Sequence, residues 1–543
     1  MKTPIIVILI FATGLISGAA VVYLKPWPWH VLREAVRQPD PTVEVDESRR
    51  IVSKFIDLDL QEFSSTDDDS QDEAVKKFAR GGGLGAYLDD ALLVDGHGSI
   101  YLLLIDALRI KRLIIQPPPN GRLELYSRDT GDREPKYKKA GWHRYTDIAY
   151  HNGFIYLIYS HFDSARECFT TRVARLRVTE PLAEIAADAK DWNVVFTSTP
   201  CFGFKFRQWP YAGHQAGGKL AVSADGQALL MTIGDYEFDG VNVRNYPQDV
   251  NADYGKILKL DLKTVDRPTI ISIGHRNSQG ITVTPNGDIW STEHGPDGGD
   301  ELNHIVEGGN YGWPYETYGA NYGARVWPLA DRQGRHDRYR KPSWAWVPSV
   351  GTSGVTYVSD FHETWNDNLL VASLVGNSIF RIVTDAAQVI TMERIDIGER
   401  VRALINHRGF LLVHTDTGDV YRIAAVDPPP SDHLERLTNS LSDAALSELN
   451  GCLECHSRGT AEKAPNLCNI LGRNIGDTDF AHYSDALKRR RESWNSDLLA
   501  SFLHDAQSVI PGMSMPNPRI GDPQIRMEII ESLSFFCSDN VSP

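Results

Sequence analysis

The pattern with the most definite chemistry in this sequence is Cys452-Leu453-Glu454-Cys455-His456, near the C-terminal end. Two cysteines three positions apart, with a histidine directly after the second, are typical of covalent c-type haem attachment. The thiols would bind the haem vinyl groups, and His456 would bind the iron. A zinc knuckle or a plain disulfide is the alternative, but no second thiol or imidazole pair follows at a spacing that zinc needs.

A thioether is expected as the ligand opposite His456. Met513 and Met515 both follow Pro511-Gly512, and the spacing favours Met515, with Met513 as the alternative. A His–Met pair raises the reduction potential and suits electron transfer. We also expect the Pro465 carbonyl to accept a hydrogen bond from His456 Nδ1 and so to orient the ring.

From about residue 440 to its end, the chain resembles a class I cytochrome c. The resemblance rests on the haem motif and on segments that follow it in order: Ala-Pro-Asn-Leu (464–467), Leu-Gly-Arg (471–473), Tyr-Ser-Asp-Ala-Leu (483–487), Trp494 and Pro-Gly-Met-Ser-Met (511–515). It implies haem c with the axial ligands His456 and Met515. It also implies that Tyr483 and Trp494 bind the haem propionates, although both could instead pack in the core.

Three stretches in the middle of the chain are too polar for strand cores, and we place them on loops at strand ends: 213–220, 274–280, and 292–303 with 309–314. His214 could act as a general base, because imidazole titrates near neutrality. Arg276 offers a planar fork to an anion. Arg400 and Arg402 alternate along a strand and therefore face one side. Plainer alternatives remain. His214 could be an ordinary turn residue, and Arg400 and Arg402 could lie on a solvated strand face. The acidic residues Asp297, Asp300 and Glu301 could bind calcium or simply solvate a loop.

The elements that position these loops form a loose repeat. Between residues 50 and 425, six units each combine apolar strands with polar turns containing Gly or Asn, and little helix signal occurs. Several short strands per unit of 40–60 residues predict blades around an axis. The fold class is therefore mainly β, with a six-bladed β-propeller over residues 48–425 and an all-α cytochrome c domain at 440–543. A β-sandwich is the alternative for the first domain.

The polar loops resemble those of the glucose/sorbosone dehydrogenase family, which includes soluble quinoprotein sugar dehydrogenases and aldose sugar dehydrogenases. The resemblance covers much of residues 205–425. It implies that His214 takes the proton of the sugar's anomeric hydroxyl while hydride leaves carbon 1 for pyrroloquinoline quinone (PQQ). It further implies that PQQ contacts Arg276, Asn277, Arg400 and Arg402.

The resemblance also implies calcium, which binds oxygen ligands. The carbonyls of Gly295 and Pro296 would bind a calcium that bridges to PQQ, and Glu301 and Tyr311 a second, structural calcium. The chain departs from the family at two positions. Gly81-Gly82-Gly83-Leu84-Gly85 stands where a Gln-Gly-Leu-Leu-Gly-type motif reaches the quinone, and Val375 follows Ser373-Leu374 where a lysine is usual.

Composition sets the compartment and the domain count. The 543 residues suggest two or three domains, and a net charge of −15 argues against nucleic-acid binding. The apolar run 4–24 is long enough for a transmembrane signal anchor; a cleaved leader peptide is the alternative. Residues 25–47 form a predicted stalk, and the Pro-rich residues 426–439 a linker. Haem attachment places both domains on the periplasmic side of the bacterial inner membrane.

Four further cysteines are expected to form disulfides in an oxidising compartment. We predict the pairs Cys168–Cys201 and Cys468–Cys537, each within one domain, with buried free thiols as the alternative.

The sequence as a whole predicts a membrane-anchored periplasmic quinohaemoprotein dehydrogenase. It would oxidise a sugar, polyol or aldehyde at PQQ, pass electrons to its own haem c, and deliver them to a respiratory acceptor such as a cytochrome or terminal oxidase. The alternative is a non-catalytic sugar-binding or sensing propeller tethered to an electron-transfer cytochrome c.

Overall fold

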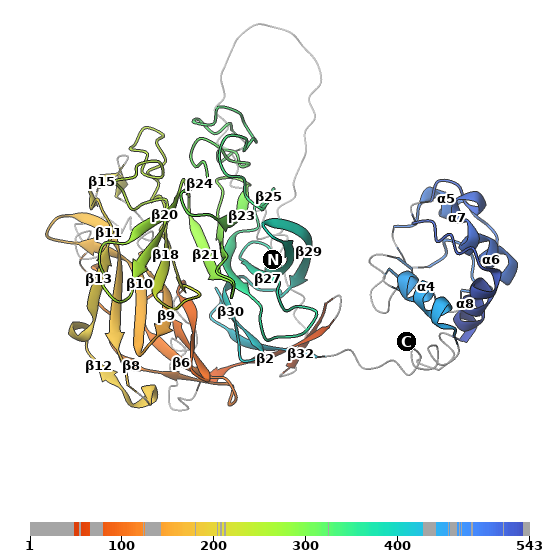
Figure 1. Cartoon of the computed structure of the whole chain (residues 1–543), viewed down its shortest axis with the longest axis horizontal. Coiled ribbons are helices and arrows are strands. Elements are labelled where there is room, and N and C mark those ends of the chain that lie inside the picture. Colours follow the sequence, from red (N-terminus) through yellow and green to blue (C-terminus); the bar gives the residue numbers. More distant parts are fainter. Residues whose placement is uncertain are drawn as a thin grey trace, which may run out of the picture. The chain divides into compact units, whose positions relative to one another are not determined.

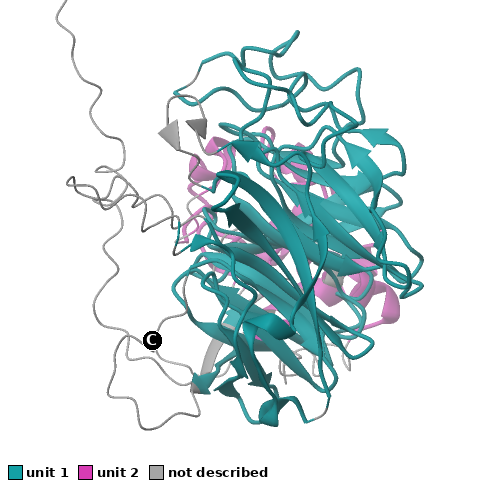
Figure 2. Ribbon diagram, turned by 90° about the vertical axis from the view of Figure 1, so that its left-hand side faces the viewer, with its two compact units in different colours: residues 1–51, 59–424 teal, residues 52–58, 425–543 magenta. Residues whose placement is uncertain are grey.

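The chain contains two compact units, residues 1–51 with 59–424 and residues 52–58 with 425–543 (Figure 2). This computed structural model describes residues 48–65, 80–124, 143–426 and 441–535, apart from gaps at 54–55, 123, 180, 204, 207–208, 211–212, 324, 454, 457–463, 466, 468–469, 479, 481 and 514. The predicted anchor, the stalk and all but the first linker residue lie outside these ranges. Among the helices that are described, none is long and apolar enough to cross a membrane.

Six sheets of four or five strands form the larger unit, and their pairs are antiparallel except for two parallel pairs at the edges. This confirms the predicted six-bladed propeller (Figure 1). The first blade contains β4 (Gly83–Tyr87), β5 (Asp90–Val94), β6 (Ile100–Leu104) and β7 (Arg109–Arg112), with β3 (Ser64–Ser65) at its edge, parallel to β7. The second contains β9 (Tyr145–His151), β10 (Phe154–Asp163), β11 (Cys168–Arg177) and β13 (Asn193–Thr197), with β14 (Phe202–Gly203) also paired to β11. The third contains β17 (Gly217–Val222), β18 (Ala228–Ile233), β19 (Lys256–Asp261), β20 (Thr269–Ile273) and β24 (Gly309–Asn310), which is parallel to β20.

The next two blades are β21 (Ser278–Val283), β22 (Ile289–Glu293), β23 (Asp300–Ile305) and β25 (Trp344–Trp346), and β26 (Thr352–Tyr357), β27 (Leu369–Ser373), β28 (Ser378–Asp385) and β29 (Gln388–Asp396). Short pairs, β8 (Ile114–Ile115) with β12 (Ala186–Ala187) and β15 (Lys205–Phe206) with β16 (Trp209–Pro210), lie outside the blades.

The last blade joins strands from both ends of the propeller sequence. It contains β30 (Val401–His407), β31 (Phe410–Thr415) and β32 (Val420–Val426), followed in the same sheet by β2 (Asp57–Glu62) and β1 (Ser48–Val52). Backbone hydrogen bonds between β32 and β2 therefore complete this blade, so that early and late segments of the chain are held in one sheet.

The innermost strands of the blades are β4, β9, β17, β21, β26 and β30, and each contacts the next around a closed ring. Close approaches join residues at matching distances from the strand starts: a Cβ on Gly85 would lie 2.7 Å from the Ile148 carbonyl oxygen, and one on Gly280 2.8 Å from the Gly354 backbone. All six strands therefore begin at one end of the central channel. We call that end, with the residues that immediately precede these strands, the mouth.

The smaller unit is all α, as predicted for the C-terminal domain. Its helices are α4 (Asp443–Leu453), α5 (Asp485–Lys488), α6 (Ser496–His504), α7 (Ala506–Val509) and α8 (Pro523–Phe535). Asn495 caps α6 by accepting a hydrogen bond from the Leu498 amide. The apolar faces of α4, α6 and α8 share one buried cluster, which includes Leu449, Phe502 and Ile530.

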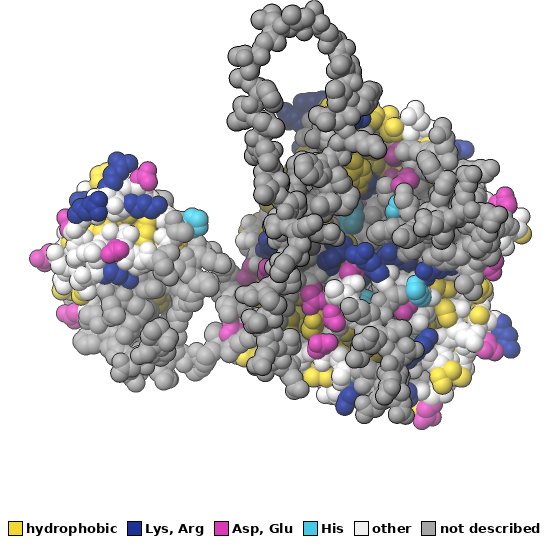
Figure 3. Space-filling view, turned by 180° about the vertical axis from the view of Figure 1, so that it is seen from behind, with side chains coloured by type: hydrophobic (Ala, Val, Ile, Leu, Met, Phe, Trp, Pro, Cys, Tyr) yellow, Lys and Arg dark blue, Asp and Glu magenta, His cyan; other side chains and the backbone are white. Residues whose placement is uncertain are grey.

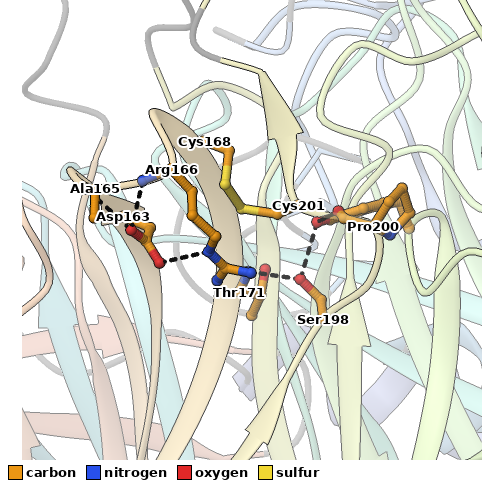
Figure 4. Close-up of a disulfide and its surroundings, with 9 residues drawn as sticks. Asp163, Ala165, Arg166, Cys168, Thr171, Ser198, Pro200 and Cys201 are labelled. Atoms are coloured by element: carbon orange, nitrogen blue, oxygen red, sulfur yellow. Dashed lines mark hydrogen bonds and ion pairs between the residues drawn. A yellow bond between two sulfur atoms is a disulfide. The ribbon is translucent and has the colours of Figure 1, made fainter.

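One predicted disulfide is present. Cys168, at the start of β11, is bonded to Cys201, 33 positions along the chain (Figure 4). Beside it, the Ser198 hydroxyl accepts a hydrogen bond from the Thr171 amide at 2.8 Å. Cys468 and Cys537 lie outside the described residues, so their pairing stays a prediction.

Candidate active site and haem pocket

The haem motif opens onto an apolar cavity of about 330 Å³ in the smaller unit. Cys452 lies in the last turn of α4, and Cys455 and His456 follow it, so the helix end directs both thiols and the imidazole to one wall. His456 Nδ1 lies 2.7 Å from the Pro465 carbonyl oxygen, the contact that the sequence predicted. Burial lowers the pKa of His456, which favours the neutral imidazole that binds metals.

The two candidate methionines have different surroundings. Met515 lines the cavity, whereas Met513 is 6% exposed and packs in the apolar cluster of the helices. Tyr483 and Trp494 also line the cavity, with Leu499 and Phe502 among its apolar walls. Two thiols, an imidazole and a thioether around a cavity of this size and character fit a covalently bound haem.

In the larger unit, the predicted site residues gather at the mouth. His214 lies shortly before β17, Arg276 and Asn277 directly before β21, and Arg400 directly before β30, with Arg402 as its second residue. They meet because the inner strands all begin at this end. The second strand of each blade ends there too, which adds Asp235, His294 and Asp416 from the turns after β18, β22 and β31.

His214 is half-buried, with 36% of its side chain exposed. Its Nδ1 lies 3.5 Å from Glu237 Oε1, a carboxylate that the sequence did not single out. A carboxylate beside one ring nitrogen orients the imidazole. The geometry is therefore that of an accessible, oriented base.

Arg276 is nearly buried and tightly held. Its Nη1 donates to the carbonyls of His294 at 3.1 Å and Gly295 at 2.7 Å, and its guanidinium lies 5.3 Å from the centre of the Trp313 ring. In the amide orientation that satisfies both neighbours, Gln215 accepts from Arg276 Nη2 at 3.2 Å and donates to Asp235 Oδ1 at 2.7 Å.

Asp235 and Asn277 link the loops of the mouth. Asp235, which Gln215 contacts, is buried, and burial raises its pKa to about 8 although Arg276 opposes the shift. Asn277 Oδ1 accepts from the Gly217 amide at 3.1 Å and so joins the start of β21 to that of β17. The loops that carry His214 and Arg276 are thus held together by hydrogen bonds.

Cationic side chains predominate at the mouth. Asp416 binds Arg402 through Nε at 2.7 Å and Nη2 at 2.9 Å, and its Oδ2 also lies 3.1 Å from Arg400 Nε and 3.2 Å from Arg80 Nε. These guanidiniums hold the pKa of Asp416 well below its usual range despite its burial. Lys and Arg side chains also form a band across one face of the larger unit (Figure 3).

Three guanidiniums on one carboxylate leave an excess of positive charge beside Arg276. PQQ carries three carboxylates, and arginine binds carboxylates in a planar, two-pronged geometry. The residues present therefore fit PQQ, with Arg276, Arg400 and Arg402 as the groups that would hold it.

The first predicted calcium site does not fit a cation in this arrangement. The Gly295 carbonyl oxygen accepts a hydrogen bond from Arg276 at 2.7 Å, and a calcium ion at that oxygen would meet the guanidinium charge. The described residues contain no cluster of three or more His, Cys, Asp or Glu side chains suited to a metal.

The second predicted calcium site fits better. Glu301 is buried, and burial together with the charge of Glu293 raises its pKa well above the usual range. Asn303 Nδ2 donates to both carboxylates, at 2.9 and 3.2 Å, while Asn303 Oδ1 is buried without a hydrogen-bond partner. Two carboxylates and an unpaired amide oxygen suit calcium. The Tyr311 ring stacks on His275, which in turn binds Glu293.

Sequence reasoning assigned no role to several of these residues: Arg80, Asp416, Glu237, and Glu293 and Asn303 within the polar stretch 292–303. Arg80 does precede the glycine run and Asp416 does follow a strand, but single charged residues at strand ends are common. Only the mutual geometry distinguishes them.

Residues 146–422 match the model of the family described as Glucose / Sorbosone dehydrogenase. Aldose sugar dehydrogenase YliI of Escherichia coli is 30% identical over 240 residues, 40% of this chain and 63% of that protein. Quinoprotein glucose dehydrogenase B of Acinetobacter calcoaceticus is 40% identical over 125 residues, 19% of this chain and 26% of that protein. The chain thus spans less than two thirds of the length of these relatives.

The fold and the C-terminal unit also have known counterparts. The crystal structure of the soluble aldose sugar dehydrogenase of E. coli in its apo-form matches with a TM-score of 0.52 and 21% identity, over 68% of this chain and all of that one. A cytochrome c homolog of Rickettsia conorii is 27% identical over 138 residues, 25% of this chain and 79% of that protein.

Proposed function

Because the chain belongs to the glucose/sorbosone dehydrogenase family, we propose that it is a quinohaemoprotein dehydrogenase that oxidises an aldose, or a related alcohol or aldehyde. The observation that carries the proposal is the meeting of an oriented imidazole, His214, with Arg276 and Arg402 at one mouth. A sugar-binding site alone has no need of such excess positive charge. The same chain also contains a cavity suited to haem c.

Each residue has a defined task in this proposal. Oxidation of an aldose to its lactone releases two electrons and two protons. His214 accepts the proton of the anomeric hydroxyl, since its side chain is partly exposed and Glu237 orients it. Arg276, Arg400 and Arg402 bind the anionic groups of PQQ and fix its position. PQQ, when bound, supplies the acceptor for the two electrons. The Glu293–Asn303–Glu301 cluster holds calcium and so fixes the loop after β22.

The C-terminal unit completes the electron path. Haem c, held by Cys452, Cys455, His456 and Met515, supplies a one-electron carrier of raised potential. Placing both units on one chain makes the transfer between them intramolecular, at a high effective concentration. A respiratory cytochrome or terminal oxidase is the proposed final acceptor.

We also propose a periplasmic location, anchored to the inner membrane by residues 4–24 or released after their cleavage. The Cys168–Cys201 disulfide supports an oxidising compartment.

A sugar-binding or sensing propeller is the second candidate. It is favoured by Gly81 and Val375, which stand at positions where the family has cofactor contacts. Val375 is 46% exposed and cannot bind an anion.

The two candidates are separated by reconstituting the full-length haem protein with PQQ and calcium and adding a panel of aldoses. The readout is reduction of the haem, followed by its absorbance. We expect reduction by at least one aldose, and His214→Gln should slow it by about 10²–10⁴-fold, the range for a general base. His362→Gln is the control, because His362 lies in the turn between β26 and β27, away from the mouth. An intact haem that no aldose reduces would refute the dehydrogenase proposal.

A further inference from the structure

Arg144 occupies space that a side chain at position 81 would otherwise fill. It directly precedes β9, and its carbonyl accepts a hydrogen bond from the Ser160 amide at 3.0 Å. A Cβ built on Gly81 would lie 2.7 Å from Arg144 Cδ and 3.1 Å from Arg144 Nη1. The arginine side chain therefore lies directly against the Gly81 backbone at the mouth.

The glycine run makes this arrangement possible. A Cβ on Gly82 would lie 1.8 Å from the Val94 carbonyl oxygen, and one on Gly83 would lie 1.9 Å from Asp147 Oδ1. Gly81 itself has a φ of +112°, which L-residues rarely adopt. The backbone before β4 thus lies flat on its neighbours, and its missing side chains leave room above it for Arg144.

The surroundings of Arg144 are already rich in positive charge. Burial and the charge of Arg402 lower the pKa of Arg144 to about 10, although Asp416 opposes the shift. Asp416 is shared by Arg80, Arg400 and Arg402. Arg144 is thus a fourth guanidinium that acts on Asp416, and an anionic ligand at the mouth would meet all four positive charges.

We propose that Arg144 is a cofactor-binding residue of this chain: its guanidinium replaces the glutamine that the family places at position 81 and donates a hydrogen bond to a quinone oxygen of PQQ. This inference rests on the proposed function. It accounts for how the chain retains a cofactor site although the glutamine and the lysine of the family pattern are both absent. The place of the glutamine is taken by an arginine from the neighbouring blade.

A binding role and a structural role predict different effects of PQQ on stability. If Arg144 merely supports the fold, replacing it by methionine lowers the unfolding temperature equally with and without PQQ. If Arg144 binds PQQ, the replacement reduces the stabilisation that is gained on adding PQQ.

The experiment measures binding rather than turnover. Arg144→Met, Arg144→Lys and the control Arg394→Met are prepared as full-length haem proteins, and their affinity for PQQ is determined by equilibrium dialysis. Arg394 lies on β29, where it contacts Ser378 and Asp396. One charge-assisted hydrogen bond corresponds to about 10- to 100-fold in affinity. We expect that loss for Arg144→Met, a smaller loss for Arg144→Lys, which keeps the charge but not the fork, and none for Arg394→Met.

A second ligand, benzene-1,3,5-tricarboxylate, separates quinone recognition from general attraction of carboxylates. Arg144→Met should lower the affinity of the protein for PQQ more than its affinity for this anion, which contains no quinone. Equal weakening of both would assign Arg144 to general charge attraction and overturn the specific proposal. If the wild type binds PQQ and Arg144→Met binds it with the same affinity, the inference about Arg144 is overturned but the proposed function is not. Failure of the wild-type protein to bind PQQ would overturn both the inference and the proposed function.

Discussion

Replacing Asp416 by asparagine tests whether a single carboxylate holds the arginines of the mouth together. The substitution keeps the size and shape of the side chain and removes only its charge. Arg80, Arg400 and Arg402 then face one another without a counterion. We expect a less stable propeller that regains stability when PQQ is added, because its carboxylates restore the missing negative charge.

The magnitude follows from the burial of each pair. Arg402 and Asp416 expose only 9% and 2% of their side chains, and removing one partner of a buried, hydrogen-bonded pair costs about 3–5 kcal/mol. Arg400 and Arg80 are 32% and 51% exposed, so each of their pairs contributes about 0–1 kcal/mol at most. The Arg402 pair therefore dominates, and Asp416→Asn should lower the free energy of unfolding by about 3–5 kcal/mol near neutral pH.

The same pair sets a pH dependence. The arginines hold the pKa of Asp416 well below its unfolded value of about 3.9, so its stabilisation is full above that value and is lost as the pH falls below it. The difference between wild type and Asp416→Asn should therefore shrink as the pH drops below about 4.

Urea unfolding of the full-length protein, followed by tryptophan fluorescence, measures these differences, with haem absorbance as an independent signal from the smaller unit. Asp188→Asn is the control, because Asp188 is exposed and its pair with Lys190 is worth little. A stability of Asp416→Asn within about 1 kcal/mol of wild type at neutral pH, or no recovery with PQQ, would refute the reasoning.

Three further predictions concern other parts of the chain. Met515→Leu should lower the haem potential in a voltammetric titration because it removes the thioether facing the cavity, whereas Met513→Leu should leave the potential unchanged and cost less than about 1.5 kcal/mol; the reverse result would exchange their assignments. Glu301→Gln should raise the unfolding temperature in a calcium chelator and abolish further stabilisation by calcium, since the amide is neutral at a position where burial and Glu293 oppose ionisation of the carboxyl; calcium stabilisation equal to wild type would move the site elsewhere. Replacing Cys168 and Cys201 by alanine should cost about 2–4 kcal/mol in urea unfolding, as expected for a closed loop of this length; an unchanged midpoint would show that the bond adds no stability.

The blades were predictable because their signals are local. Apolar strands alternate with Gly- and Asn-containing turns, and each inner strand can be found from residues close to it in sequence. The pairing of β2 (Asp57–Glu62) with β32 (Val420–Val426) was not predictable, because no pattern in either segment indicates its partner strand. The spacing after Pro511-Gly512 only favoured Met515 over Met513, and the packing of the helices then places Met515 at the cavity and Met513 in the core.

The sequence by itself determined the haem motif, the polar loops with His214 and Arg276, and the positions where family residues are missing. All of these depend on residue types at short spacing. Only the tertiary structure decided what those residues meet. Arg80 and Asp416 are 336 positions apart, and Arg144 reaches Gly81 from the next blade. Such contacts arise from the ring of inner strands, which brings six loops that are distant in sequence to one end of the channel and places their charged side chains close together.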